Sequence, residues 1–366
     1  MKYVDEFRNA VIAKRLIKKI KDIARRIDRQ VCLMEVCGTH TVAIFRSGIR
    51  EILPQNIRII SGPGCPVCVT AQEDIDKAVA VCQLPQTIVT TFGDMMKVPG
   101  TLHSLTTIAA RGYDVRLVYS ALNALDIAQH NPTKRVVHLS VGFETTAPTI
   151  AATLMRARKE KINNFFILCA HKLIPPALRA LLSSPKIKIS GFILPGHVST
   201  IIGARPYRFI SEQHKICAVI AGFEPLDILQ SVAVLLEQIR QGSSKIVIQY
   251  SRCVKDRGNA KAQQVLKRVF SICDTNWRGL GTIKKSGYRL RPSFKNFDIE
   301  RHIKFELPRQ KQTNCRCGDV LQGIILPFEC KLFKKACTPE KPIGPCMVSS
   351  EGTCAAYYRY GGRCGQ

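Results

Sequence analysis

Cysteine is the residue that distinguishes this sequence, because 16 of its 366 residues carry a thiol. Thiolates bind soft metal ions, hold iron–sulfur clusters and exchange with disulfides, so their spacing decides which chemistry is available. Seven of the thiols lie between Cys315 and Cys364, and two more form a Cys-x-x-Cys pair at Cys65 and Cys68. The distribution therefore directs attention to one early loop and to the tail of the chain.

The early pair lies in the loop GPGCPVC at residues 62–68. Its spacing allows the two sulfur atoms to meet within one turn, which Pro66 stiffens. Such a pair suits a redox-active dithiol or half of a zinc site. A zinc ion would need two more ligands, and the only early candidates, Cys32 and Cys37, have a Cys-x4-Cys spacing that suits zinc poorly. We favour the redox dithiol, with two packed core cysteines as the remaining alternative.

A third early thiol, Cys37, stands in MEVCGTHT between an apolar run and a helical pattern. It could be a nucleophile with His40 as its base, or a soft ligand for iron or copper(I). Taken alone, it could equally be a small core residue. Because Cys37, Cys65 and Cys68 all follow apolar runs, we expect three exposed thiols at one sheet edge, which favours metal or redox chemistry.

The tail gives the strongest signal, with six thiols within forty residues. They are Cys315, Cys317, Cys330, Cys337, Cys346 and Cys354. Six exceed the needs of one metal centre, whereas four thiolates around a [4Fe-4S] cluster and a neighbouring dithiol would use them all. Structural zinc is the alternative, but zinc favours tight Cys-x-x-Cys knuckles, which this tail lacks.

Other polar residues and thiols give weaker signals. Single polar groups that follow an apolar run are Asp94, Glu144, His197 and Glu224. Each suits a helix cap or a solvated group as well as a functional one. The remaining cysteines have no neighbouring thiols, and we interpret them as buried small hydrophobes or incidental thiols. They are Cys82, Cys169, Cys217, Cys253, Cys273 and Cys364.

A repeating unit between residues 31 and 240 must position these loops: a short apolar run, a glycine-bearing loop and a helical pattern. The runs are VCLMEV, IRIIS, TIVTT, DVRLVYS, VVHLSV, FFILCA, ISGFILP and CAVIAG. Runs that are nearly all apolar, rather than alternating, indicate parallel strands covered on both faces, and their alternation with helices predicts an α/β fold. Loops at the carboxyl ends of parallel strands share one edge, so we expect them to converge on one or two clefts.

The sequence predicts four segments. Residues 1–30 form an amphipathic helix, in which Leu16, Ile20, Ile23 and Ile27 share one face. Two Rossmann-like parallel-sheet domains follow at 31–125 and 126–243. A smaller cysteine-rich [4Fe-4S] domain at 244–366 opens with a polar helix, KDRGNAKAQQVLKRVFSIC.

Composition excludes several classes of protein. No run of about 18 apolar residues is present, so no membrane span is expected. The first thirty residues have no apolar signal-peptide region, so we expect a cytoplasmic protein whose thiols stay reduced unless they bind metal or do redox work. The net charge of +28 is spread along the chain with few aromatic residues and no nucleic-acid motif, so nucleic-acid binding is not expected. A zinc-containing nucleic-acid binder therefore stays only as a further alternative, because the charge is the single feature that suggests it. No P-loop motif is present.

The motifs, taken together and in order, closely resemble one family. From about residue 31 to the C-terminus, MEVCGTHT, GPGCPVCVT, TFGDMMKVPG, GFETTAP, PGHVSTIIG, GFEPLDIL and the tail from CRCGDVLQG to GTCAAYYRY are similar to the [NiFe]-hydrogenase maturation family HypD. The resemblance implies a scaffold with redox activity, rather than a conventional turnover enzyme, that builds the Fe(CN)2CO unit of the hydrogenase. A stand-alone iron–sulfur thiol–disulfide oxidoreductase is the alternative.

The resemblance also implies roles for individual residues and partners. Cys37 would hold the iron of the transient Fe(CN)2CO fragment together with a cysteine of the chaperone HypC, and cyanide would arrive from HypE. Cys65 and Cys68 would form the redox pair beside the iron. The implied cluster ligands are Cys315, Cys330, Cys337 and Cys354, and the implied adjacent dithiol is Cys317 with Cys346. Further family motif positions are Thr39, His40, Asp94, Glu144, Thr145, His197 and Glu224. We expect a monomer before complex formation.

Overall fold

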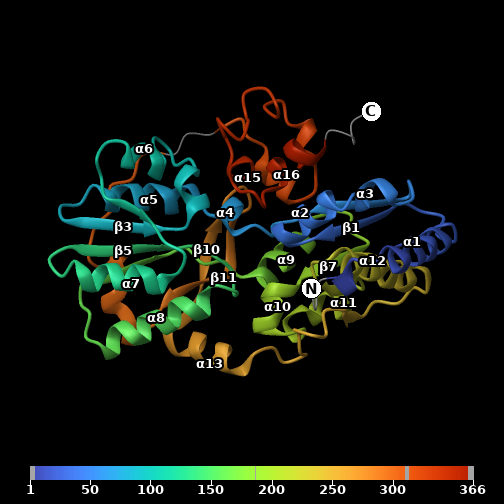
Figure 1. The fold of residues 1–366 in the computed structure, drawn as a ribbon, viewed down its shortest axis with the longest axis horizontal. Helices are drawn as coiled ribbons and strands as arrows, with labels where there is room; N and C mark the ends of the chain where they lie inside the picture. Colours follow the sequence, from blue (N-terminus) through green and yellow to red (C-terminus); the bar gives the residue numbers. More distant parts are fainter. Residues whose placement is uncertain (1–4, 186, 310–312, 362–366) are drawn as a thin grey trace.

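The computed structural model describes residues 5–185, 187–309 and 313–361 (Figure 1). Two parallel sheets form its two lobes, and the cysteine-rich segment lies above the junction between them. Cys364 lies outside the described residues. The predicted α/β class with parallel sheets is confirmed.

All eight predicted strands are present. The first sheet has the order β2-β1-β7-β8-β9: β1 (Val31–Glu35), β2 (Ile57–Ser61), β7 (Gly191–Pro195), β8 (Cys217–Ala221) and β9 (Ile246–Ile248). The second sheet has the order β4-β3-β5-β6: β3 (Thr87–Thr91), β4 (Val115–Leu117), β5 (Arg135–Ser140) and β6 (Phe165–Cys169). The strands β3, β7 and β8 are buried along their whole length, because helices cover both faces of each sheet.

The strands are not shared between the sheets in chain order. The chain leaves the first sheet after β2, builds the whole second sheet, and returns so that β7 pairs with β1. The predicted boundary between residues 125 and 126 falls between β4 and β5, inside the second sheet, and so does not separate the two sheets. Apolar runs predict strands but do not specify their partners, which is why the order of the chain misled the prediction.

Helices connect the strands and cover the sheets. Their bounds are α1 (Ala10–Ala24), α2 (Gly38–Arg46), α3 (Ile49–Ile52), α4 (Pro66–Val69), α5 (Gln72–Cys82), α6 (Leu105–Ala109), α7 (Ala121–His130), α8 (Ala147–Lys159), α9 (Ile174–Leu182), α10 (Gly196–Ile202), α11 (Arg208–Glu212), α12 (Pro225–Arg240), α13 (Ala260–Val269), α14 (Cys317–Leu321), α15 (Pro345–Val348) and α16 (Thr353–Tyr360). The predicted amphipathic helix is α1, which packs on α12 and buries Ile20 and Ile23.

The region after residue 244 differs from the prediction. Strand β9 completes the first sheet, and only Ala260–Val269 of the predicted polar helix is helical. The last four residues of the predicted helix, FSIC, begin an antiparallel hairpin of β10 (Phe270–Trp277) and β11 (Gly281–Leu290). Phe270 and Leu290 join the core of the second lobe. The cysteine-rich unit is therefore confined to residues 313–361 of the described chain. The hairpin was missed because FSIC continues the helical pattern by type, although tertiary pairing makes it a strand.

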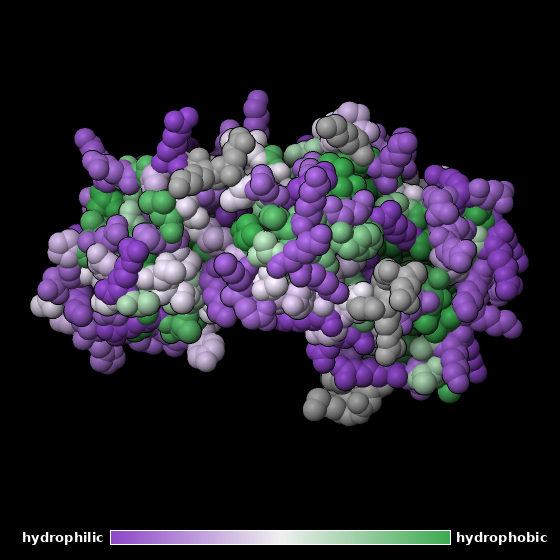
Figure 2. All heavy atoms as spheres, turned by 90° about the horizontal axis from the view of Figure 1, so that it is seen from above, coloured by the Kyte–Doolittle hydropathy of each residue, from purple (hydrophilic) through white to green (hydrophobic). Residues whose placement is uncertain are grey.

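The described part of the chain contains no helix that is both long and apolar enough to span a membrane. Viewed from above, hydrophilic side chains cover most of the visible surface, with small apolar areas between them (Figure 2).

Candidate functional site

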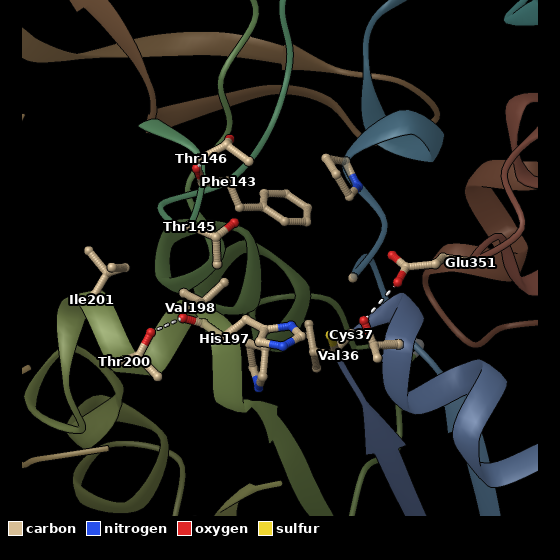
Figure 3. A pocket seen from close by; sticks show the side chains of 14 residues that line it. Val36, Cys37, Phe143, Thr145, Thr146, His197, Val198, Thr200, Ile201 and Glu351 are labelled. Atoms are coloured by element: carbon tan, nitrogen blue, oxygen red, sulfur yellow. Dashed lines mark hydrogen bonds between the residues drawn. The ribbon is translucent and has the colours of Figure 1, made fainter. Parts of the chain in front are cut away.

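A cleft of about 470 Å³ lies where loops of the two sheets meet (Figure 3). Loops after β1, β2 and β7 of the first sheet line it, together with the loop after β5 of the second sheet. These loops carry the motifs CGTH, GPGC, PGHVS and GFETT. The prediction that motif loops converge on a cleft is confirmed for these four; the GDMM and GFEP loops do not line it.

Cys37 lines the cleft directly before the first turn of α2. The backbone N–H of His40, in the first turn of α2, favours the charged form of this sulfur. Burial, followed by the nearby Glu351 carboxylate, raises the pKa of Cys37 to about 12. The thiol therefore keeps its proton until a positively charged partner, such as a metal ion, replaces it.

The three early thiols are less accessible than we expected. Cys37 is 8% exposed, Cys65 is 4% exposed and Cys68 is fully buried. The expectation of three exposed thiols is wrong, because the cysteine-rich segment covers this edge of the sheet. Cys37 alone among them lines the cleft; Cys65 and Cys68 do not, and the Cys68 thiol lies near the carbonyl of Pro345.

The CGTH and GPGC loops are fixed to each other through their backbones. The Gly38 N–H donates to the Gly64 carbonyl at 3.0 Å. A Cβ on Gly64 would collide with the backbone of Cys37, so only glycine allows this approach. The loop that carries the Cys-x-x-Cys pair thereby supports the backbone that presents Cys37.

His40 lies behind Cys37 rather than in the cleft. Its Nε2 is 2.9 Å from the carbonyl oxygen of Gly222, so Nε2 carries the proton and donates it. Its ring stacks on Phe223, which stacks in turn on His197 with centroids 4.0 Å apart. Burial lowers the pKa of His40 to about 4, so the ring is neutral at pH 7. This geometry suits a positioning residue, whereas His197 reaches the cleft.

Glu351 is a cleft residue that the sequence did not reveal. It comes from the cysteine-rich segment and accepts a hydrogen bond of 2.7 Å from the Thr39 hydroxyl (Figure 3). Two residues earlier, Ser349 donates to Asp94 at 2.8 Å. Residues 349–351 thus connect the cysteine-rich segment to motif loops of both sheets. A glutamate between two cysteines carries no spacing signal, so only the fold brings it to Cys37.

None of the three predicted acidic residues lines the cleft: Asp94 accepts from Ser349, and the other two lie at the starts of helices. Glu144 is buried and accepts a hydrogen bond from the backbone N–H of Ile174 at 3.1 Å, at the start of α9, and burial raises its pKa to about 8. Glu224 forms an ion pair with Arg8 at 2.7 Å and precedes α12. Thr145, next to Glu144, does line the cleft.

The Cys-x-x-Cys pair faces the tail cysteines. Cys65 precedes α4, and its sulfur accepts from the Cys68 N–H at 3.3 Å. The Cys68 thiol lies 3.9 Å from the carbonyl oxygen of Pro345 and within hydrogen-bonding reach of the Cys346 thiol. Burial raises the pKa of Cys68 well above its ordinary value.

All six tail thiols surround one small internal cavity. Cys346 has three sulfur neighbours, which are Cys68, Cys317 and Cys354. Cys317 also contacts Cys315, so sulfur atoms form a continuous network from the Cys-x-x-Cys pair into the tail. The network brings together cysteines that lie about 250 or more residues apart in the sequence.

The donor set of the cavity fits an iron–sulfur cluster. Thiolates placed around a cavity are the ligands such clusters use, and hydrogen bonds to their sulfurs tune them. The Ile343 N–H donates to the Cys337 sulfur at 3.4 Å, and a Cβ on Gly344 would occupy the space of the Cys315 sulfur. No group of three or more His, Cys, Asp or Glu side chains in residues 5–185, 187–309 and 313–361 is arranged around a single ion position.

Together, these features define an α/β protein in which a cleft bearing a single thiol adjoins a closed, cysteine-rich centre. The HypD family model, described as "Hydrogenase formation hypA family", matches residues 11–361. The chain therefore belongs to the HypD family of hydrogenase maturation factors, which confirms the resemblance seen in its motifs.

Curated relatives agree over the whole length of the chain. The hydrogenase maturation factor HypD of Escherichia coli (strain K12) is 45% identical over 98% of both chains. HypD2 of Bradyrhizobium diazoefficiens is 44% identical over 99% of this chain and 97% of its own. A putative hydrogenase expression/formation protein of Methanocaldococcus jannaschii is 43% identical over 95% of this chain and 97% of its own.

Proposed function

We propose that this protein is the scaffold on which the Fe(CN)2CO fragment of a [NiFe]-hydrogenase is assembled, and that it also supplies reducing equivalents for that assembly. One observation carries the proposal. The GPGCPVC loop lines the Cys37 cleft through Gly64 and Pro66, and through Cys68 it also joins the thiol network of the six-cysteine cavity. Relatives that share this chain's full length are named as hydrogenase maturation factors.

Cys37 is the proposed anchor for the iron, which is cargo rather than a resident cofactor. A soft thiolate suits low-spin iron, and binding the metal would remove the proton that burial otherwise retains. The N-terminus of α2 and the His40 N–H favour a negatively charged sulfur at this position. The cleft, at about 470 Å³, has room for a small fragment and for a second thiol from a partner.

Residues across the cleft suit the diatomic ligands of such a fragment. Cyanide bound to iron accepts hydrogen bonds through its nitrogen, so donors are needed opposite Cys37. Thr145 and His197 extend into the cleft from two other loops (Figure 3). Apolar neighbours such as Phe143 and Val198 suit carbon monoxide, which is a poor hydrogen-bond acceptor.

The tail is the proposed source of electrons. Cys315, Cys330, Cys337 and Cys354 would hold a [4Fe-4S] cluster, which supplies single electrons when bound. Cys317 and Cys346 would form the adjacent dithiol, which can pass two electrons to a disulfide. The contacts of Cys346 with both Cys317 and Cys68 support this division, because they put the proposed dithiol next to the Cys-x-x-Cys pair.

The proposed partners are a HypC-type chaperone, whose cysteine would complete the iron site, and a HypE-type cyanide donor. The alternative, a stand-alone thiol–disulfide oxidoreductase, would need a sulfur that a protein disulfide can reach. Cys65 at 4% exposure and fully buried Cys68 do not meet that need, so we favour the scaffold.

Infrared spectroscopy of protein purified anaerobically with its HypC-type partner tests the proposal. We expect absorption bands of iron-bound cyanide and carbon monoxide in the unmodified protein. They should be lost in Cys37→Ala and retained in Cys82→Ala, which alters an equally buried thiol in α5 outside the cleft. Bands that survive Cys37→Ala would remove Cys37 as the anchor.

A further inference from the structure

Arg278 occupies the tip of the β10–β11 hairpin, at the junction of the thiol-bearing segments. Its backbone N–H donates to the carbonyl of Val69, the last residue of α4, at 2.9 Å. The next residue, Gly279, has a φ of +75° and presses against the backbone of Gly318 in α14. The hairpin tip is thus held between the helix of Cys68 and the helix that begins at Cys317.

Arg278 is partly buried, and within the described residues its guanidinium forms no ion pair with a carboxylate. Its Nη2 donates to the carbonyl of Pro99 at 2.8 Å, whereas Nη1 is buried and has no hydrogen-bond partner within the described residues. The nearby carboxylate of Asp76 accepts two other hydrogen bonds, both from Thr101, at 2.6 Å. A buried cation normally requires a paired anion, because desolvation otherwise costs several kcal/mol.

The electrostatic neighbours of this guanidinium are sulfur atoms. Apart from Asp76, they are Cys317, Cys315 and Cys346. All three line the cysteine cavity, which an anionic, thiolate-bound centre would fill. Arginine suits such a position better than lysine, because its charge is permanent and weakly hydrated.

We propose that Arg278 is the counter-charge of the iron–sulfur centre and raises its reduction potential. This inference rests on the proposed function, since it requires a thiolate-bound cluster in the tail. Reduction adds one electron to a centre that is already negative, so a fixed positive charge in a low-dielectric surrounding stabilises the reduced form more than the oxidised form.

Arg316 provides a matched control. It lines the same cavity and is adjacent in sequence to Cys315. Its side chain is 48% exposed, however, and already forms an ion pair with Asp319 at 2.8 Å. Solvent and that carboxylate screen its charge, so Arg316 should affect the centre much less than Arg278 does.

The test is a redox titration of the full chain, purified anaerobically and reduced stepwise by dithionite with mediators, followed by visible absorption and electron paramagnetic resonance. Iron and acid-labile sulfide are measured on each variant first. Arg278→Gln should lower the equilibrium constant for one-electron reduction at least tenfold, which corresponds to a fall of about 59 mV. Arg278→Lys should retain most of the potential, and Arg316→Gln should shift it by much less than Arg278→Gln.

The outcomes separate the two proposals. If the unmodified protein contains no iron and no acid-labile sulfide, the cluster proposal is refuted, and this inference is refuted with it. A loaded Arg278→Gln variant with an unchanged potential overturns the role of Arg278 alone, as does an equal shift in Arg316→Gln. If Arg278→Gln fails to load while Arg278→Lys loads and keeps the potential, the positive charge is required and the inference stands. Failure of both variants to load would assign Arg278 a structural role, through its bond to Pro99, and overturn the inference.

Discussion

Cys37 and the tail cysteines present the same functional group in opposite surroundings. Cys37 is a single thiol at the wall of an open cleft of about 470 Å³, and its near neighbours are oxygen and nitrogen groups. The six tail thiols surround a small cavity, and Cys315, Cys317, Cys346 and Cys354 are neighbours in one series. An open site with one soft ligand suits cargo that must enter and leave, whereas a closed site with several ligands suits a resident group.

The largest effect is expected from a substitution that disrupts the six-cysteine cavity and leaves the Cys37 cleft intact. Cys330→Ala removes a proposed cluster ligand, and one lost thiolate leaves an iron without its protein ligand. We expect the brown cluster absorption and the acid-labile sulfide to fall close to background, measured on anaerobically purified protein. Cys253→Ala, which alters an exposed thiol outside the cavity lining, is the control. An unchanged spectrum in Cys330→Ala would remove that residue from the ligand set.

A second change targets the backbone contact that presents Cys37. Gly64→Ala would push a methyl group into the backbone of Cys37, and forced packing of this kind costs about 2 kcal/mol or more. We expect a lower midpoint in chemical denaturation and a loss of the infrared bands of bound cyanide. Gly93→Ala is a matched control from another motif loop, because a Cβ at Gly93 would meet no other atom within 4 Å. Equal stability of the two variants would show that the loop contact is not required.

These two sites also show what the sequence could reveal. The strands were predictable, because runs such as Cys217–Ala221 consist only of apolar residues, and the structure buries every one of them. The loops that follow parallel strands share one sheet edge, which is why CGTH and PGHVS could be expected to meet. Pairing of β1 with β7 was not predictable, since any apolar strand satisfies the same local rules.

Residues contributed by distant segments were missed for the same reason. Glu351 meets Thr39 across 312 positions, and Arg278 reaches the tail cysteines from a hairpin that the sequence did not predict. The residues next to Glu351 and Arg278 in the sequence give no sign that these two side chains lie near the proposed sites. Conversely, Glu144 and Glu224 stand in conspicuous loops but end in helix-start interactions, because a carboxylate after a strand satisfies the next helix as readily as it serves a cleft.

The third prediction concerns Glu144, a motif carboxylate that lies outside the cleft. Burial holds the pKa of Glu144 at about 8 in the folded protein, above its unfolded value. The folded state therefore binds the extra proton, and this contribution to stability is present at low pH and is lost as pH rises from about 4.5 to 8. Glu144→Gln keeps an acceptor for the Ile174 N–H but cannot ionise. We expect its stability relative to the unmodified protein to rise by about 3 kcal/mol between about pH 5 and pH 8, measured by chemical denaturation. Parallel pH profiles would contradict the burial of an ionisable Glu144.

The smallest expected effect concerns Glu351, the carboxylate that does reach the cleft. Its negative charge is the second cause, after burial, of the raised pKa of Cys37, which stands at about 12. Glu351→Gln removes the charge but keeps an oxygen that can accept from the Thr39 hydroxyl, so the loop should hold its position. The pKa of Cys37 should then fall by less than about one unit, since burial remains, and alkylation at fixed pH should become several-fold faster. Site-resolved mass spectrometry of iron-free protein would measure that rate. Cys82, buried in α5 outside the cleft, is the internal reference and should react at an unchanged rate. The contrary outcome is an unchanged rate for Cys37 in Glu351→Gln, together with faster alkylation of Cys37 in Thr39→Val. In that case residues 349–351 act by covering the cleft and not through the charge of Glu351, so access to Cys37 depends on the position of this segment.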